Sequence, residues 1–88
     1  KKLDAYEKIL KKHKIEDSEI CYIGDDLIDL PILRKVGFSV AVPNAPSEVK
    51  EEVSYITDAA GGYGAVREVT EKILKSQGKW NEIIARYY

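Results

Sequence analysis

Short apolar runs alternate along this chain with segments whose apolar residues recur every three or four positions. Apolar runs of this length predict strands, and the three-to-four spacing predicts amphipathic helices. The predicted strands are 20–24, 38–42 and 55–57, and the predicted helices are 2–12, 27–35, 47–53 and 66–77. Strands that alternate with helices indicate a parallel sheet with right-handed crossovers, so we expect an α/β fold.

The first predicted strand, 20–24, is a continuous apolar run, which is typical of a strand buried on both faces. Three strands are too few to enclose it on both edges. We therefore expect its second edge to pair with strands that this chain does not contain, or with another copy of the chain. Residues 1–88 are predicted to form a single partial domain with a C-terminal tail at 79–88.

The composition of the 88 residues, 44% hydrophobic and 33% charged, fits one soluble globular piece that is small for a complete α/β enzyme. A formal net charge of -1 gives no basic surface for nucleic acid. We expect a cytoplasmic protein without membrane contact, because the sequence shows neither a signal peptide nor an apolar run near the ~20 residues of a membrane span. The single cysteine, Cys21, fits a reducing compartment. The chain starts at Lys1 and contains no methionine, so we expect it to begin inside a longer sequence.

Three carboxylates, Asp25, Asp26 and Asp29, follow the first strand. Close like charges are unfavourable unless a positive group neutralises them, and oxygen ligands of this kind suit Mg²⁺. Open α/β sheets also place their chemistry at the carboxyl ends of their strands. The sequence therefore indicates a magnesium site. The alternative is an acidic helix cap, which accounts for Asp26 without a metal but explains Asp25 and Asp29 poorly.

The segment Gly24-Asp25-Asp26-Leu27-Ile28-Asp29, placed after an apolar strand, resembles the fourth motif of the haloacid dehalogenase superfamily. Nearly the whole chain resembles one family within it, the 3-deoxy-D-manno-octulosonate 8-phosphate phosphatases. The similar segments are 2–3, 25–31, 36–42, 61–68 and 77–80. The resemblance implies the C-terminal half of a Rossmann-like parallel sheet in a three-layer α/β/α arrangement.

The resemblance further implies a Mg²⁺-dependent phosphatase of lipopolysaccharide biosynthesis, which hydrolyses a sugar-acid phosphate through an aspartyl-phosphate. Asp25 would bind Mg²⁺ directly, and Asp26 would belong to the same metal site. Asp26 and Asp29 would support the metal's waters and a lysine that holds the phosphate. Lys2 matches the position of that lysine, although by position alone it is an ordinary solvated residue near a chain end.

Substrate contacts are implied for five residues: Asn44, Gly61, Gly62, Tyr63 and Arg67. Asn44 is equally well explained by turn chemistry, because it lies beside a proline. Tyr63 stands where the family usually has Arg, and a phenol cannot replace a guanidinium charge. The exact sugar acid therefore stays open. Alternatives are a phosphatase of another nonulosonate phosphate and the phosphatase-like module of acylneuraminate cytidylyltransferases.

The implied partners are the sugar-acid phosphate, an N-terminal half and further copies of the chain. In this family the nucleophilic Asp, its acid–base partner and the phosphate-binding Ser or Thr belong to the N-terminal half, so we expect the fragment alone to be inactive. The family also implies a homotetramer whose C-terminal tail approaches a neighbouring active site. Here the tail carries an apolar stripe that would need a partner: Trp80, Ile83, Ile84 and Tyr87.

Two hypotheses that assign the chain to other classes of protein compete with the phosphatase hypothesis. A Gly-Asp-Asp sequence also occurs in template-dependent RNA polymerases, where it lies in a turn between antiparallel strands. Here the motif leads into a helical pattern that contains Pro31, which disfavours that reading. The second alternative is a non-catalytic association fragment, in which the strand edge and the tail bind another subunit and the acidic turn is structural.

Overall fold

The computed structural model describes residues 2–78, so the predicted tail at 79–88 lies outside the described residues. Every strand and helix predicted within this range is present, with shifted ends. The helices are α1 (Lys2–His13), α2 (Leu30–Leu33), α3 (Ser47–Lys50) and α4 (Tyr63–Ser76), with short 3-10 turns η1 (Asp17–Glu19) and η2 (Leu27–Asp29). The strands are β1 (Cys21–Gly24), β2 (Phe38–Ala41) and β3 (Tyr55–Ile56).

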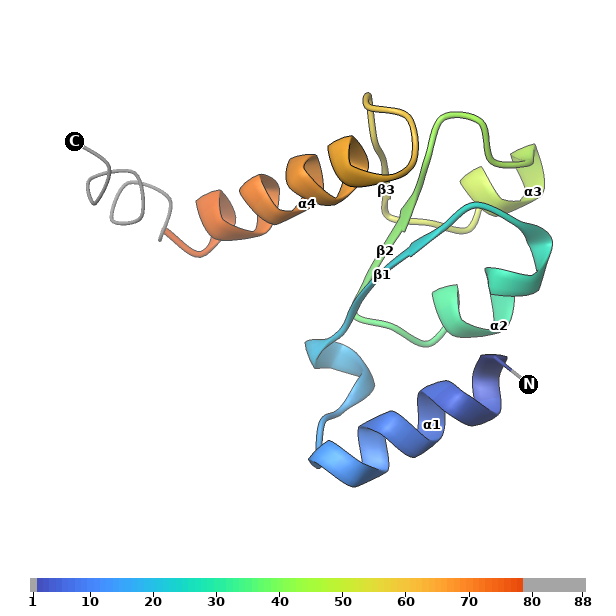
Figure 1. The fold of residues 1–88 in the computed structure, drawn as a ribbon, viewed down its shortest axis with the longest axis vertical. Coiled ribbons are helices and arrows are strands. Elements are labelled where there is room, and N and C mark those ends of the chain that lie inside the picture. Colours follow the sequence, from blue (N-terminus) through green and yellow to red (C-terminus); the bar gives the residue numbers. More distant parts are fainter. Residues whose placement is uncertain (1, 79–88) are drawn as a thin grey trace.

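The three strands form a parallel sheet in the order β1-β2-β3. Figure 1 shows α1, α2 and α3 on one side of this sheet and α4 on the other, which gives three layers. Gly24 pairs with Ala41, and Ala41 with Ile56, so the carboxyl ends of the strands lie at one rim. This arrangement confirms the expected α/β/α class for the part of the chain that the structure describes.

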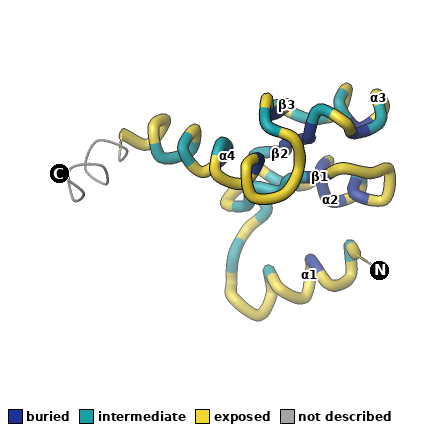
Figure 2. The backbone as a smooth tube through the Cα atoms, turned by 45° about the horizontal axis from the view of Figure 1, so that its top comes forward, coloured by how far each residue is buried: buried dark blue, intermediate teal, exposed yellow. Residues whose placement is uncertain are grey.

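The core lies around β2, the central strand. Val40 and Ala41 are fully buried, and they point to opposite faces of the sheet because side chains alternate along a strand. Leu33 from α2 and Val49 from α3 pack with Ala41, and Ala65 from α4 completes the same cluster. Figure 2 shows buried residues on β2 and α2, whereas α1 and much of α4 are exposed.

The prediction that 20–24 is buried on both faces needs a correction. In β1 only Gly24 is buried, and Cys21, Tyr22 and Ile23 are half-buried. The reason is topological, because among the described residues β1 pairs only with β2 and forms one edge of the sheet. The sequence pattern predicted the most buried strand to be β1, but the central strand β2 is the buried one.

The predicted helices 27–35 and 47–53 are shorter than expected, and the predicted helix 66–77 begins earlier. The segment 27–35 divides into η2 and the single turn of α2, with Pro31 accommodated at its start. Helix α3 ends at Lys50 rather than at residue 53. Helix α4 begins at Tyr63 rather than at 66, because Gly62 adopts a φ of 85° that turns the loop directly into the helix.

The amino ends of the strands are held by close backbone contacts. The Gly37 N–H donates to the Asp17 carbonyl over 2.8 Å, and the Tyr6 hydroxyl donates to the Asp17 carboxylate over 2.6 Å. A Cβ on Gly37 would lie 2.3 Å from the Ser18 carbonyl oxygen, so only glycine fits there. These contacts fix α1 and η1 against the start of β2.

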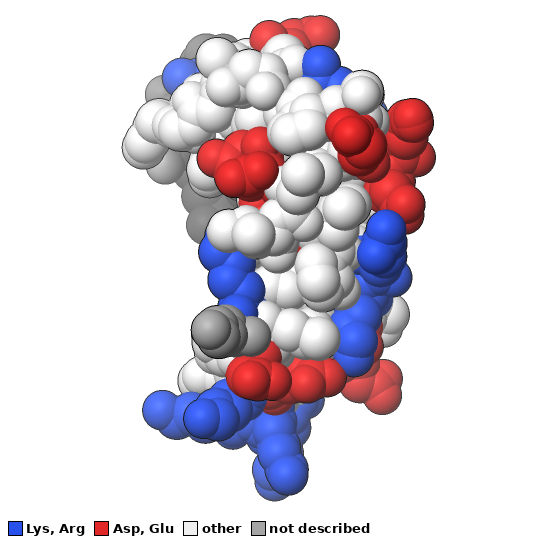
Figure 3. All heavy atoms as spheres, turned by 90° about the vertical axis from the view of Figure 1, so that its right-hand side faces the viewer, with Lys and Arg blue, Asp and Glu red and all other residues white. Residues whose placement is uncertain are grey.

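The described surface carries charges of both signs. Figure 3 shows Lys and Arg gathered toward the end where α1 lies and acidic side chains in several separate groups. Ion pairs join different elements, such as Arg34–Glu52 at 3.2 Å and Lys35–Glu7 at 2.9 Å. Among the described residues, no helix combines the length and the apolar character that crossing a membrane requires.

Candidate active site

A pocket of about 290 Å³ lies at the carboxyl rim of the sheet. The first residue of α1, the turn after β1, and the loop before α4 meet there. Five of the predicted site residues line it: Lys2, Asp25, Asp29, Gly61 and Gly62. Tyr22, Val42 and Ala65 also contribute to its wall. The carboxyl rim is where open α/β sheets bind their ligands, so the pocket is the candidate site.

Asp29 is the centre of the polar contacts in this pocket. Its side chain is only 2% exposed, and both of its oxygens accept hydrogen bonds. Oδ1 accepts from the Lys2 ammonium over 2.8 Å and from the Tyr22 hydroxyl over 3.0 Å. Oδ2 accepts from the backbone N–H groups of Asp25 and Asp26 over 3.0 and 3.2 Å. The carboxylate thereby fixes the position of the lysine and the shape of the acidic turn together.

These contacts shift the pKa values of the groups involved. Burial alone would raise the pKa of Asp29, but hydrogen bonds from Lys2, the Asp25 amide, Tyr22 and the Asp26 amide lower it to about 2. The hydrogen bond to Asp29 raises the pKa of Lys2, and burial and the same carboxylate raise the pKa of Tyr22. Near neutral pH the pocket therefore holds an ammonium, a carboxylate and a neutral phenol.

The other two carboxylates of the turn are exposed and differently placed. Asp26 caps η2, since its Oδ1 accepts from the Leu27 N–H over 2.7 Å, as the helix-cap alternative anticipated. Asp25 lines the pocket on the exposed side of the turn. Within residues 2–78, no three acidic, histidine or cysteine side chains are grouped so as to hold a metal ion. Lys2 and the backbone amides of Asp25 and Asp26 compensate the charge of Asp29.

This donor set still fits a magnesium ion of the usual protein type. Mg²⁺ retains several waters and needs only one or two carboxylates, the rest coming from substrate phosphate or other protein oxygens. Asp25 offers an exposed carboxylate on a turn whose backbone is held by Asp29. Asp26 has a second oxygen beyond the one that caps η2. Asp29 itself is occupied by four donors, which suits support of the site rather than direct ligation.

The remaining predicted residues lie outside the pocket wall. Asn44 is exposed in the turn that follows β2. Tyr63, which is 88% exposed, and Arg67 line a separate shallow hollow on α4, where Arg67 pairs with Glu71 at 3.2 Å. Gly61 and Gly62 thus line the pocket, whereas Tyr63 and Arg67 lie on the exposed surface of α4.

Two residues important to this geometry were not singled out from the sequence. Tyr22 looked like one apolar residue of a strand, and no periodic signal marked its hydroxyl as a partner of Asp29. Glu68 accepts hydrogen bonds from the loop before α4, at the backbone N–H groups of Asp58 and Ala59. Glu68 belongs to the segment 61–68 on which the resemblance rests, and that was the available signal.

Residues 1–69 match the haloacid dehalogenase-like hydrolases, and the chain belongs to this family. Its relatives include 3-deoxy-D-manno-octulosonate 8-phosphate phosphatases. The 3-deoxy-D-manno-octulosonate 8-phosphate phosphatase of Salmonella typhi is 47% identical over 81 residues, which cover 92% of this chain and 43% of that protein. The corresponding enzyme of Yersinia pestis is 45% identical over 78 residues, covering 89% of this chain and 42% of that protein.

Solved structures agree with these relationships. The Moraxella catarrhalis 3-deoxy-D-manno-octulosonate 8-phosphate phosphatase, crystallised with magnesium, phosphate and a KDO molecule, superposes with a TM-score of 0.92 at 46% identity, covering 99% of this chain and 50% of that one. The cobalt-bound Haemophilus influenzae enzyme superposes with a TM-score of 0.81 at 39% identity. The match covers 88% of this chain and 44% of that one. The chain thus spans about half the length of the relatives it matches, and its partial fold is confirmed.

Proposed function

We propose that this chain is the C-terminal half of a Mg²⁺-dependent phosphatase that hydrolyses 3-deoxy-D-manno-octulosonate 8-phosphate to the free sugar acid and phosphate. The observation that carries the proposal is the pocket in which Lys2, bound to buried Asp29, faces the exposed carboxylate of Asp25. An ammonium beside a magnesium-binding carboxylate is an arrangement that stabilises a transferring phosphoryl group. The relatives named above support the substrate class.

The chemistry divides between the two halves of the enzyme. An aspartate from the N-terminal half attacks phosphorus, the bond from phosphorus to the sugar oxygen breaks, and a second acid protonates the leaving oxygen. The same second residue, now acting as a base, takes a proton from water, which attacks phosphorus; the bond from phosphorus to the aspartate oxygen breaks, and phosphate and the free carboxylate are released. Magnesium would be held by Asp25 with Asp26, and would screen charge on the phosphoryl oxygens. In this chain, Lys2 holds a phosphoryl oxygen and Asp29 keeps Lys2 in place.

The glycine loop completes the substrate side of the pocket. Gly61 and Gly62 lie across from Lys2, and the absence of side chains there leaves room for a sugar acid. Asn44, Tyr63 and Arg67 lie farther out and would contact substrate only at its periphery or through neighbouring chains. Because Tyr63 carries no charge, phosphates of other nonulosonates are the principal competing substrates.

Reconstitution tests the proposal. The chain is combined with an N-terminal half that supplies an Asp-x-Asp motif, and phosphate release is measured with 3-deoxy-D-manno-octulosonate 8-phosphate and other nonulosonate phosphates. We expect Mg²⁺-dependent turnover that a chelator removes. Asp25→Asn should abolish it, because it removes a charge from the metal without changing shape. Asp29→Asn should reduce turnover by about 10- to 100-fold, since it acts through Lys2.

Two outcomes would contradict the proposal. If the reconstituted enzyme released no phosphate from any sugar-acid phosphate, the activity would be wrong. If Asp25→Asn left both Mg²⁺ affinity and turnover near wild type, the metal assignment would be wrong and the acidic turn would be only a cap.

We further propose that the complete enzyme is a cytoplasmic homotetramer that serves lipopolysaccharide biosynthesis. The family resemblance supports this assembly, and residues 79–88 would contribute to it. Light scattering on the reconstituted enzyme checks it, and a monodisperse monomer at high concentration would contradict it.

A further inference from the structure

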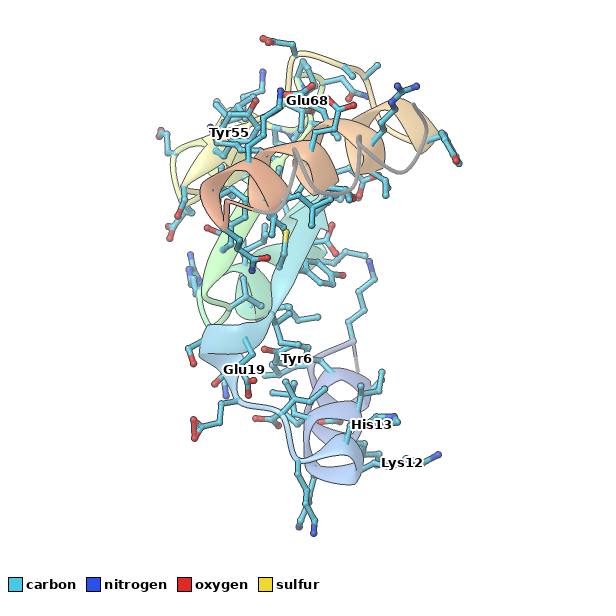
Figure 4. All side chains as sticks on the ribbon, turned by 90° about the vertical axis from the view of Figure 1, so that its left-hand side faces the viewer. Tyr6, Lys12, His13, Glu19, Tyr55 and Glu68 are labelled. Carbon is cyan, nitrogen blue, oxygen red and sulfur yellow. The ribbon has the colours of Figure 1, made fainter. Side chains whose placement is uncertain are left out.

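Glu68, one turn into α4, is bonded to three groups of the segment that precedes the helix. Its carboxylate accepts from the Asp58 N–H over 3.0 Å and from the Ala59 N–H over 2.8 Å. It also accepts from the hydroxyl of Tyr55 in β3. Figure 4 shows Tyr55 and Glu68 close together between β3 and α4. One carboxylate thus joins a strand, a loop and a helix.

The segment that Glu68 holds leads directly into the candidate site. After Asp58 and Ala59 the chain reaches Gly61 and Gly62, which form the pocket wall across from Lys2. The Thr57 hydroxyl donates to the Ala59 carbonyl over 2.7 Å, so Ala59 is fixed at both its N–H and its C=O. The position of the two glycines therefore depends on a loop anchored two residues before Gly61.

A cation supports this anchor from the other side. The Lys72 ammonium lies 4.6 Å from the centre of the Tyr55 ring, one turn beyond Glu68 on α4. The hydrogen bonds from Tyr55, Ala59 and Asp58 lower the pKa of Glu68, and Lys72 adds to that effect. Glu68 is thus anionic near neutral pH, and a charged acceptor binds amide groups more strongly than a neutral one.

We propose that Glu68 is a positioning residue that sets the place of Gly61 and Gly62 in the pocket. Its consequence for catalysis rests on the proposed phosphatase function. Glu68 does not touch substrate, and it acts through the backbone of Asp58 and Ala59. Contacts from the glycine wall are made to substrate and transition state alike, so loosening the wall weakens substrate binding rather than the chemical step.

Two measurements on Glu68→Gln test this inference. In the 88-residue chain, amide exchange at Asp58 and Ala59 should accelerate by about 10- to 100-fold, because a charge-assisted hydrogen bond is lost. In the reconstituted enzyme, KM should rise by about 10- to 100-fold while kcat stays close to wild type. Tyr55→Phe removes one donor and leaves the two amide bonds, so it should change both quantities in the same direction but less.

The matched control is Glu71→Gln, which makes the same chemical change one turn later on α4, where Glu71 pairs with Arg67 instead of the loop. It should leave amide exchange and KM unchanged. Unchanged exchange in Glu68→Gln would overturn the anchor itself. If amide exchange in Glu68→Gln were faster but its KM and kcat equalled those of Glu71→Gln, the positioning role would be wrong. Absence of activity in the wild-type reconstituted enzyme would instead refute the phosphatase function, and with it the catalytic part of this inference.

Discussion

Lys2 and Asp29 are 27 positions apart in the sequence, yet the Lys2 ammonium lies 2.8 Å from the buried Asp29 carboxylate. The contact joins the start of α1 to the turn after β1. Lys2 is 49% exposed, so its remaining hydrogen-bonding capacity is directed to the pocket and to solvent. The pair therefore has a fixed, buried anion and a partly accessible cation, which is the polarity required to bind a phosphoryl group.

Asp29→Asn should destabilise the chain. The amide keeps the size of the side chain but loses the charge that Lys2 and the turn amides bind. We expect the free energy of unfolding to fall by about 2 kcal/mol, as for a hydrogen bond to a charged group. Urea unfolding at pH 7 measures this. Asp26→Asn is the control, because Asn caps helices as well as Asp does, and an equal loss in both variants would contradict the prediction.

The stabilising contribution of Asp29 should depend on pH. Its pKa is about 2 in the folded chain against an ordinary 3.8, so folding favours the ionised form. The contribution is complete above about pH 4 and disappears as pH falls through about 2. Glu52 and Glu68 also have lowered pKa values, so the informative quantity is the difference between wild type and Asp29→Asn. Urea midpoints from pH 5 to 2 should converge, and parallel curves would contradict the assignment.

Lys2→Met should lower turnover of the reconstituted enzyme by about 10²- to 10³-fold, the range for loss of one donor to a transition-state oxyanion. Met preserves much of the length of the side chain and removes the ammonium. Lys2→Arg keeps the charge but changes its geometry, so it should retain more activity than Met. Steady-state phosphate release at saturating Mg²⁺ measures both. Equal activity of Lys2→Met, Lys2→Arg and the wild type would show that the Lys2 ammonium does not contact the phosphoryl group.

Gly37→Ala should destabilise the chain by about 1–3 kcal/mol or more, because the added Cβ would lie 2.3 Å from a backbone oxygen that cannot move aside easily. Gly61→Ala is the comparison, since its Cβ would meet only the Val42 side chain at 3.8 Å. Its effect should stay within about 0.5 kcal/mol. Thermal unfolding of the two variants measures the difference, and similar melting temperatures would contradict the close approach of Gly37 to Ser18.

The periodic pattern predicted the order and type of every strand and α-helix within residues 2–78, because burial and backbone geometry both impose that periodicity, but it did not predict the 3-10 turns η1 and η2. The pattern predicted the ends of the helices and strands less accurately. The pattern at 27–35 suggests one continuous helix, but Asp29 bonds back to the Asp25 and Asp26 amides and produces a tighter turn. Leu27 and Ile28 are consequently exposed rather than buried. Hydrogen bonds between a side chain and the backbone produce no periodic pattern in the sequence.

The candidate site was predictable in part. The cluster of carboxylates after an apolar strand located the acidic turn, and the family resemblance indicated Lys2, which no spacing argument could bring near Asp29. The roles of Tyr22 and Glu68 were missed, because each depends on a hydroxyl or a carboxylate that reaches across elements. Contacts of that kind are fixed by the three-dimensional arrangement of the strands, and a single sequence does not encode them as a local pattern.

The parallel sheet separates two kinds of constraint in space. The tight approach of Gly37 to Ser18 lies at the amino ends of the strands, and the pocket of Lys2 and Asp25 lies at the opposite rim. A protein engineer can therefore optimise rigidity at one end with little effect on chemistry at the other. In the reconstituted enzyme of the proposed function, libraries that randomise the connection between α1 and β1 should yield variants that differ in heat resistance but share one substrate profile, whereas libraries in the loop before α4 should change the profile first.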